Sequence, residues 1–381
     1  MAESKIKVAL ICQNKMLAGG ATTYESNVVS YLMKENHENL EFVIFQAKSL
    51  ASQNDLGRVC SYRNGMLQQF GAFLRSTVFG LEILRIISFR LGQLERLLIK
   101  SDIDIAYFLS PNPLALGILD VPMVNTVWDL GHRDLPEFHE LAGDGRFKKR
   151  EYFYSNVLSR SSLVVTDSEE TCNRLIAVYG LDPKRVLSAG LFPSVEGESP
   201  SVDINFEFEN DRFFLYPAQF WPHKNHEFLI EFMKIFCISN PSYKLIFTGS
   251  DKGNLREIKD KIVNANLQNN IIILGFVENR LLTKLMTSAV GVLFVSRLGP
   301  TNLPPLEALS LGTPVVVTHT NCNLLHDPKN GVWVVEDDSI SSLIDAVDEL
   351  IIGKKSKLEW SFHEANRVSV KEILTRIINY V

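Results

Sequence analysis

The chain has 381 residues, of which 46% are hydrophobic and 22% charged, and its formal net charge at pH 7 is −5. This length suggests about two domains of roughly 150 residues each, and the apolar fraction suffices for two buried cores, which excludes disordered and fibrous proteins. The 44 acidic residues outnumber the 39 basic ones, so nucleic acid is not an expected general partner, because binding of phosphates needs a basic surplus.

Short apolar runs alternate with helical patterns along the chain. Strands separated by helices of 10–15 residues predict βαβ units and parallel sheets, and the number of strands exceeds one doubly wound unit. We therefore expect an α/β protein with two Rossmann-like domains in series. The predicted strands are 7–12, 42–45, 105–109, 123–127, 163–166, 213–216, 244–247, 271–274, 291–295, 314–317 and 332–335, and the predicted helices are 24–33, 169–179, 226–238, 278–288 and 339–352.

The domain boundary is expected near residue 195. The stretch from Ala189 to Ser194 is followed by an acidic segment with Ser and Pro that continues to about Asn210, a composition typical of linkers. This predicts domains at 1–195 and 196–361. The tail from Lys354 has a helical pattern and no strand, so it can leave the second sheet and pack elsewhere.

The segment 70–100 is apolar at helical spacing and rich in arginine. Basic residues interrupt it at Arg75, Arg85, Arg90, Arg96 and Lys100, although residues 1–195 as a whole have equal numbers of basic and acidic side chains. One interpretation is a basic amphipathic surface for an anionic membrane. The other is a pair of helices packed on the core with solvated arginines.

Cysteine usage and hydropathy favour a cytoplasmic protein. The five cysteines are scattered and lack CxxC spacing, so neither a disulfide framework nor a zinc site is indicated. No stretch approaches the 18 or so apolar residues of a membrane span, and the N-terminal residues lack the apolar core of a signal peptide.

The first two motifs follow predicted strands in the N-terminal half. Gly19 and Gly20 precede the first helix, where paired glycines let the backbone approach a ligand; the alternative is a glycine turn with a capping box. No GxGxxG or GxxxxGK[ST] motif occurs.

Asp129 and His132 follow the strand 123–127, in a cluster of titratable groups that can bind sugar hydroxyls and exchange protons.

Lys224 lies in the turn between strand 213–216 and the next helix. A lysine beside a helix N-terminus suits a diphosphate leaving group that gains charge in the transition state. The alternative is an exposed loop lysine. Two further turns, at Gly249 and at Phe276-Val277, are expected on the same edge of the sheet and favour a binding site.

The most specific motif is the stretch from Gly299 to Pro314. It predicts a strand, a Gly-Pro turn and a helix opened by prolines, with Glu307 in the first helical turn. In the turn that begins at Pro300, the backbone N–H groups around Thr301, Asn302 and Leu303 can hold phosphate oxygens, and Glu307 can accept from ribose hydroxyls. The alternative for Glu307 is a carboxylate that only complements the helix dipole.

Two acidic stretches are not expected to be sites. Asp102 and Asp104 form a DxD that leads into a core strand instead of following one, so we do not expect it to bind metal. The acidic stretch 336–338 is most simply a solvated loop before the helix that begins near Ser339.

In these motifs the chain resembles the retaining family-4 glycosyltransferases of the GT-B fold, in the branch that builds bacterial cell-surface polysaccharides. The resemblance covers nearly the whole length. It implies two Rossmann-like domains that face a central cleft, a C-terminal helix at about 362–381 that crosses back to the N-terminal domain, and an acceptor on that domain. It also implies a nucleotide-sugar donor that needs no metal or cofactor. The residues that would hold this donor are Lys224 and Gln219 at the diphosphate, Gly19-Gly20 at the diphosphate side of the sugar, Glu307 at the ribose and the Phe276-Val277 backbone at the base.

Three positions depart from the family pattern. Gly299 stands where the family has a glutamate, Gln219 where an arginine is common, and Trp128 precedes Asp129 where a histidine is usual. The role of the family histidine is therefore assigned to His132, three residues beyond Asp129.

The resemblance predicts transfer of a sugar from a UDP- or GDP-sugar to a hydroxyl of a glycan or lipid-linked oligosaccharide, in the cytoplasm or on the cytoplasmic face of the membrane. A nucleotide-sugar epimerase or a phosphorylase on the same fold is an alternative, although no lysine stands in a cofactor-anchoring context. A degenerate transferase that serves as a binding or scaffold subunit is a third.

Overall fold

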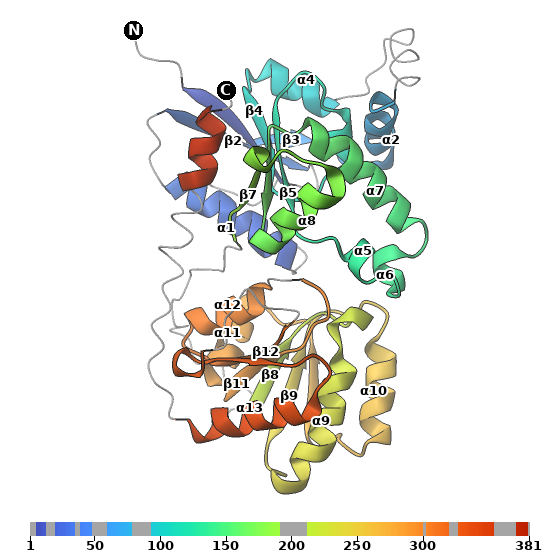
Figure 1. The fold of residues 1–381 in the computed structure, drawn as a ribbon, viewed down its shortest axis with the longest axis vertical. Helices are drawn as coiled ribbons and strands as arrows, with labels where there is room; N and C mark the ends of the chain where they lie inside the picture. Colours follow the sequence, from blue (N-terminus) through green and yellow to red (C-terminus); the bar gives the residue numbers. More distant parts are fainter. Residues whose placement is uncertain are drawn as a thin grey trace. The chain divides into compact units, whose positions relative to one another are not determined.

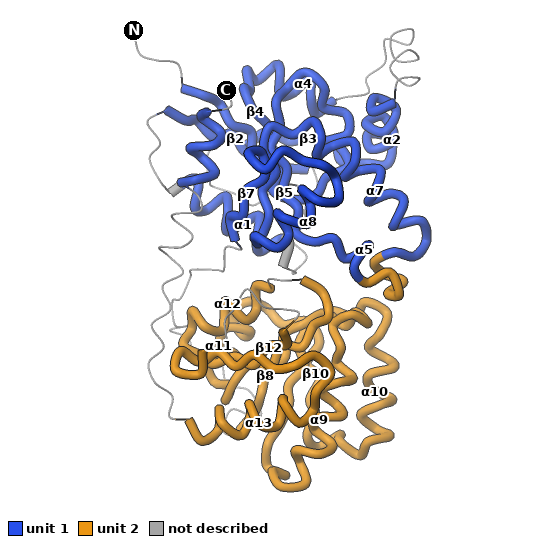
Figure 2. Tube along the Cα trace, viewed as in Figure 1, with its two compact units in different colours: residues 1–134, 142–192, 364–381 blue, residues 135–141, 193–363 orange. Residues whose placement is uncertain are grey.

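The computed structural model describes residues 5–12, 20–34, 39–47, 59–77, 93–190, 212–299, 302–319, 327–353 and 371–379 (Figure 1). The chain divides into two compact units (Figure 2). Unit 1 comprises residues 1–134, 142–192 and 364–381, and unit 2 comprises 135–141 and 193–363. The boundary predicted at 195 falls in segment 191–211, outside the described residues.

Unit 1 is built on a seven-stranded sheet in which all pairs are parallel, in the order β3-β2-β1-β4-β5-β6-β7. The strands are β1 (Ile6–Cys12), β2 (Leu40–Ala47), β3 (Val59–Tyr62), β4 (Ile105–Phe108), β5 (Met123–Val127), β6 (Leu163–Thr166) and β7 (Val186–Ser188). Central strand β4 is buried along its full length, as expected for a parallel strand covered on both faces.

Unit 2 has a six-stranded parallel sheet in the order β10-β9-β8-β11-β12-β13. Its strands are β8 (Phe213–Pro217), β9 (Lys244–Thr248), β10 (Ile271–Gly275), β11 (Gly291–Phe294), β12 (Val315–Thr318) and β13 (Val332–Val335). The strand order reverses between β8 and β11, as it does between β1 and β4 in unit 1. The prediction of two Rossmann-like sheets is therefore confirmed.

The helices of unit 1 lie between the strands, and α8 has caps at both of its ends. Helix α8 begins after Ser168, whose side chain accepts a hydrogen bond from the backbone N–H of Thr171, and it ends at the left-handed Gly180. The described helices are α1 (Gly20–Lys34), α2 (Met66–Arg75), α4 (Gln93–Lys100), α5 (Gly131–Asp134), α6 (His139–Ala142), α7 (Arg146–Val157) and α8 (Glu169–Tyr179), of which α6 also contributes to unit 2.

The C-terminal helix, residues 371–379, belongs to unit 1. Its residues Ile373, Leu374 and Ile377 are buried, and Arg376 Nη1 donates to the backbone oxygen of Lys184 at 2.9 Å. The expected return of the chain end to the N-terminal domain is thus confirmed.

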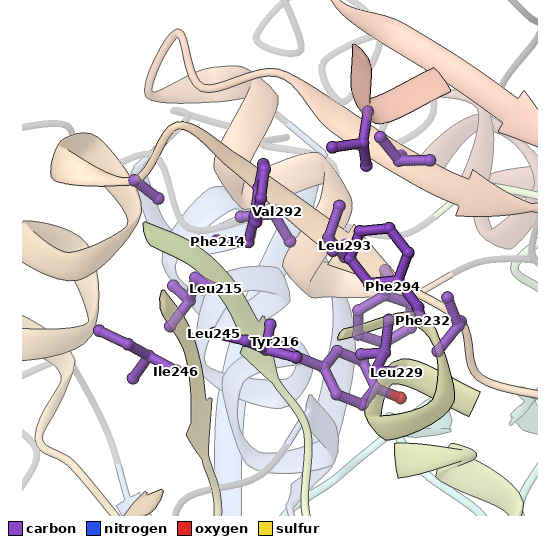
Figure 3. Packing of buried hydrophobic residues seen from close by; sticks show 14 of the residues in the cluster. Phe214, Leu215, Tyr216, Leu229, Phe232, Leu245, Ile246, Val292, Leu293 and Phe294 are labelled. Atoms are coloured by element: carbon purple, nitrogen blue, oxygen red, sulfur yellow. The ribbon is translucent and has the colours of Figure 1, made fainter. Parts of the chain in front are cut away.

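The core of unit 2 lies where α9 covers the central strands. One buried cluster contains Phe214 and Tyr216 of β8, Phe294 of β11, and Leu229 and Phe232 of α9. Figure 3 shows Tyr216 and Phe294 beside the two α9 side chains. All five side chains are buried, which explains the near-continuous apolar runs that predicted these strands. The helices of unit 2 are α9 (His226–Ser239), α10 (Leu255–Asn264), α11 (Asn279–Ser288), α12 (Leu303–Ser310) and α13 (Ile340–Ile352).

The segment 70–100 forms helices at both of its ends, α2 and α4, while residues 78–92 lie outside the described residues. Strands β3 and β7 have no counterpart in the predicted pattern. Both are short edge strands, of four and three residues, so they show too few alternations to stand out from loop sequence.

Candidate functional site

The turns that follow β8 and β11 meet at the carboxyl edge of the sheet in unit 2. The strand order reverses between these two strands, and in open α/β sheets such a reversal creates the crevice in which ligands bind. The predicted residues Gln219 and Lys224 follow β8, and Asn302 follows β11. The site is therefore at the position that the topology favours.

Lys224 joins the two turns. It ends a short 3-10 helix, η5 (Pro222–Lys224), and the left-handed Asn225 (φ 56°) then turns the chain into α9. Its Nζ donates to Ser296 Oγ at 3.0 Å and to Asn302 Oδ1 at 3.3 Å, and it lies 5.5 Å from the ring centroid of Phe294. Both of these acceptors are neutral oxygens.

The turns after β9 and β10 lie beside the turn between β8 and α9 that contains Lys224 (the lysine turn), as predicted. Gly249 has φ 146°, and a Cβ there would come within 2.6 Å of the carbonyl carbon of Ala218, so only glycine permits this approach. Its N–H donates to the backbone oxygen of Gly275 at 2.7 Å. Next to Gly275, the Phe276 side chain is 55% exposed and available at the surface. Val277 is half-buried beside it.

Gln219 shapes the lysine turn. Its Oε1 accepts a hydrogen bond from Trp221 Nε1 at 3.0 Å, and the backbone N–H of Trp221 donates to the Gln219 carbonyl at 2.8 Å. The side chain that replaces the family arginine is therefore held within the turn by Trp221.

Helix α12 corrects one expectation about Glu307. The helix begins at Leu303, which is buried, so Glu307 is its fifth residue and lies in the second turn instead of the first. An acidic residue in the second turn interacts little with the helix dipole, because that effect falls off within the first turn. Glu307 is half-buried and has contacts of its own. Pro300, Thr301 and Gly19 lie outside the described residues, and Gly20 is the first residue of α1.

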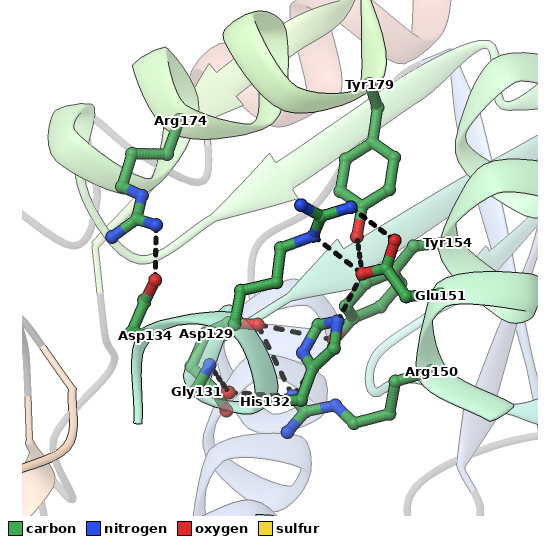
Figure 4. A network of polar contacts seen from close by, with 10 residues as sticks. Asp129, Gly131, His132, Asp134, Arg150, Glu151, Tyr154, Arg174 and Tyr179 are labelled. Atoms are coloured by element: carbon green, nitrogen blue, oxygen red, sulfur yellow. Dashed lines mark hydrogen bonds and ion pairs between the residues drawn. The ribbon is translucent and has the colours of Figure 1, made fainter. Parts of the chain in front are cut away.

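In unit 1, Asp129 follows β5 and is held by two donors (Figure 4). Its Oδ1 accepts from Gly131 N–H and from Arg150 Nη2, each at 2.7 Å. Burial acts to raise the pKa of this carboxyl, but Arg150 and the Gly131 N–H outweigh burial and lower it. Asp129 is therefore ionised at neutral pH, with its side chain 23% exposed.

His132 points away from solvent. Its side chain is fully buried, its Nε2 lies 2.6 Å from Glu151 Oε1, and its ring packs against Phe147 and Tyr154. Burial and the nearby Arg150 lower its pKa, so the imidazole is neutral at pH 7. His132 thus anchors α5, and its assignment as a catalytic group stays a prediction.

Glu151 organises this network. It accepts hydrogen bonds from Arg133 and from Tyr179 Oη (2.9 Å) besides its contact with His132. Burial acts to raise its pKa, but these donors lower it to about 2. Sequence reasoning missed Arg150 and Glu151; they lie in the charged run 146–151, which by itself does not indicate their partners.

The DxD, Asp102 and Asp104, lies at the amino ends of the unit 1 strands, whereas Asp129 follows the carboxyl end of β5. Asp104 Oδ2 accepts from the backbone N–H of Lys7 at 2.7 Å, and Asp102 lies 3.9 Å from Lys7 Nζ, both before β4 begins. Within the described ranges, no group of three His, Cys, Asp or Glu side chains is arranged to hold a metal ion. The same ranges contain no helix long and apolar enough to cross a membrane.

Comparison with solved structures defines the class of fold. The chain is similar to Anabaena HepE, solved in complex with UDP and glucose, with a TM-score of 0.69 at 16% identity; the likeness covers 99% of this chain and 100% of that one. The likeness shows the GT-B fold, with two Rossmann-like domains, that the resemblance implied.

The sequence comparisons specify the second domain. Residues 200–367, which contain the lysine turn and α12, match the family described as Glycosyl transferases group 1. Over 207 residues, 49% of this chain, it is 30% identical to an uncharacterized glycosyltransferase of Methanocaldococcus jannaschii. Over 194 residues, 51% of this chain, it is 24% identical to the O-antigen chain mannosyltransferase of Salmonella typhimurium. The chain spans about half the length of these relatives, 51% and 52%.

Proposed function

We propose that this protein is a glycosyltransferase that moves a sugar from a UDP- or GDP-linked donor to a hydroxyl of a glycan or lipid-linked oligosaccharide. The observation that carries this proposal is the position of Lys224 Nζ, held by Ser296 and Asn302 where the β8 and β11 turns meet. The family match over residues 200–367 and the similarity to an O-antigen mannosyltransferase support the same activity.

The chemistry requires a positive charge at the leaving group. In the transfer, the bond from the anomeric carbon to the diphosphate oxygen breaks, a bond to the acceptor oxygen forms, and the proton of the acceptor hydroxyl passes to the departing diphosphate. The departing diphosphate gains negative charge, and a preorganised ammonium stabilises that charge more in the transition state than in the ground state. Lys224 supplies this charge, and we propose, from the family resemblance, that the anomeric configuration is retained.

The other assigned residues have donor-binding roles in this proposal. Glu307 accepts from the ribose hydroxyls, and the exposed Phe276 with Val277 forms the surface for the base. Asp129, ionised and partly exposed, accepts from a sugar hydroxyl on unit 1. The reaction needs no metal in this proposal, so turnover should be the same in EDTA as in buffer with Mg²⁺.

Nucleotide binding is the first test. UDP and GDP, each added to the purified protein, should be compared by thermal shift, since a ligand that binds only the native state raises its apparent stability. One of them should raise the melting temperature of wild type, and by a smaller amount that of Lys224→Ala. If neither nucleotide binds, a degenerate transferase that serves as a scaffold is favoured. If the protein converts the nucleotide sugar into an isomer in the absence of an acceptor, an epimerase is favoured.

We also propose a peripheral membrane contact through α2 and the segment that follows it. Four large apolar side chains of α2 are exposed: Met66 (88%), Leu67 (80%), Phe70 (58%) and Phe73 (41%). They precede the arginine-rich part of segment 70–100. An exposed apolar helix face, followed in the sequence by basic residues, suits an anionic bilayer surface, where we expect a lipid-linked acceptor.

A further inference from the structure

A short piece of chain from between β5 and β6 belongs to unit 2. Residues 135–141 follow α5 of unit 1, yet they pack with the second unit (Figure 2). The contacts converge on His223, the residue before Lys224. The ring of Phe138 meets the His223 ring edge-on at 6.2 Å, and Glu140 lies against the same residue.

Glu140 makes two hydrogen bonds to His223. Its Oε1 accepts from the backbone N–H at 3.1 Å and from ring Nδ1 at 2.9 Å. Both side chains are nearly inaccessible, with exposed fractions of 9% for Glu140 and 7% for His223. Water therefore does not compete well for these bonds, and a buried carboxylate is costly unless it is paired in this way.

The protonation states follow from this geometry. Burial acts to raise the pKa of Glu140, but the hydrogen bonds from the His223 ring and backbone lower it, so the carboxylate is ionised at neutral pH. An ionised carboxylate only accepts hydrogen bonds, so the His223 Nδ1 must have the proton. The two hydrogen bonds from His223 to Glu140 therefore hold both the backbone and the ring of His223 in place.

The lysine turn is also held from its other sides. The His223 carbonyl accepts from the Arg297 N–H at 2.8 Å, and the Lys224 carbonyl accepts from Tyr216 Oη. The backbone of His223 and Lys224 is thus hydrogen-bonded to the turn after β11, to β8 and to Glu140. Glu140 lies 83 residues before His223 in sequence, outside the part of the chain that forms the sheet of unit 2.

We propose that Glu140 is a positioning residue for Lys224. By holding His223, it keeps η5 in the conformation that places the lysine Nζ at Ser296 and Asn302. This inference rests on the proposed function, in which that ammonium meets the diphosphate of the donor. The stretch 129–141 then has two tasks, because it begins with the Asp129 carboxylate of unit 1 and ends with the support for the lysine of unit 2.

The test compares three variants of the full-length protein. Glu140→Ala removes the acceptor, Glu140→Gln keeps an oxygen at the same position without the charge, and Glu137→Ala removes an exposed carboxylate from the same segment as a control. Calorimetry with UDP and GDP, and donor kinetics, are the readouts. For Glu140→Ala we expect nucleotide affinity and kcat/KM to fall on the order of tenfold, because small misplacements of a catalytic group are costly. Glu140→Gln should stay within about twofold of wild type, since its oxygen still accepts both bonds.

The outcomes separate the two claims. If wild type binds UDP or GDP and Glu140→Ala binds as tightly and turns over as fast as Glu137→Ala, the positioning role is wrong. Equal losses in Glu140→Ala and Glu140→Gln would also overturn it, because charge would then matter and not the acceptor position. If Glu140→Ala does not fold, His223→Phe removes only the ring donor; wild-type affinity and kcat/KM in that variant would contradict the proposal. Wild type that binds neither nucleotide contradicts the proposed function instead.

Discussion

Lys224 Nζ donates a hydrogen bond of 3.0 Å to Ser296 Oγ, which joins the turn after β8 to the turn after β11 across the reversal of strand order in unit 2. The two residues are 72 positions apart in sequence. Ser296 is buried and also accepts from the backbone N–H of Leu298, so the acceptor is itself held in place.

Removal of the Lys224 charge should mainly slow turnover. For Lys224→Ala we expect kcat to fall by roughly 10²-fold, as when one preorganised charge-stabilising donor is lost, with the fold intact by circular dichroism. Lys234→Ala removes an exposed lysine of α9 that pairs with Glu231, and it should retain wild-type turnover. Near-wild-type kcat in Lys224→Ala would contradict the role of this residue.

The Glu151 network should make unit 1 sensitive to acid. The pKa of Glu151 is about 2 in the folded protein and ordinarily 4.5, so its stabilising contribution is present above pH 4.5 and is lost as the pH falls toward 2. By linkage this amounts to ~3 kcal/mol, although solvent screening reduces it. Chemical denaturation of wild type and Glu151→Gln between pH 7 and pH 3 measures the difference, which should shrink at the acid end. A constant difference would show that the carboxylate charge is not the cause.

Gly249 should not tolerate a side chain. Gly249→Ala places a Cβ against the backbone of Ala218, so we expect a loss of at least ~2 kcal/mol in the free energy of unfolding and weaker nucleotide binding. Gly253→Ala is the matched control, because Gly253 also has a positive φ (103°) but nothing within 4 Å of its Cβ position. Equal effects of the two substitutions would mean that backbone strain, and not the clash, sets the cost.

The exposed face of α2 should mediate binding to anionic vesicles. The double substitution Met66→Glu with Leu67→Glu removes two of its most exposed apolar side chains and adds negative charge, so sedimentation with phosphatidylglycerol vesicles should fall several-fold. Ile235→Glu with Ile238→Glu changes exposed apolar residues of α9 and serves as the control. No binding of wild type, or binding that is equal with neutral phosphatidylcholine vesicles, would count against the membrane contact.

Much of the fold and part of the site were predictable from local pattern. The apolar runs located the strands from β8 to β13 within a residue or two, because strands buried on both faces have almost no polar positions. The glycine at 249 and the lysine at 224 stood out because they follow such strands. Glu307 was placed in the first helical turn although it is the fifth residue of the helix, because the prolines at 304 and 305 indicated a helix start without fixing its first residue.

Contacts between distant segments were not predictable. Nothing local in the charged run 146–151 indicates that Arg150 would hold Asp129 or that Glu151 would hold a buried His132. The same is true of Glu140, whose partner His223 belongs to the other half of the chain. Each contact depends on how helices pack on a sheet, which side-chain periodicity does not encode.

The sequence by itself determined that this is a parallel α/β protein with two sheets and that its polar residues gather in the turns after the strands, because burial imposes a local periodicity on each element. Only the tertiary structure decided which turns are neighbours. The order β10-β9-β8-β11 brings the turns of Lys224, Gly249 and Ser296 to one edge, and the packing of residues 135–141 on unit 2 adds Glu140 to the lysine turn. Strand order and helix packing are non-local, so the site exists only once the sheet has formed.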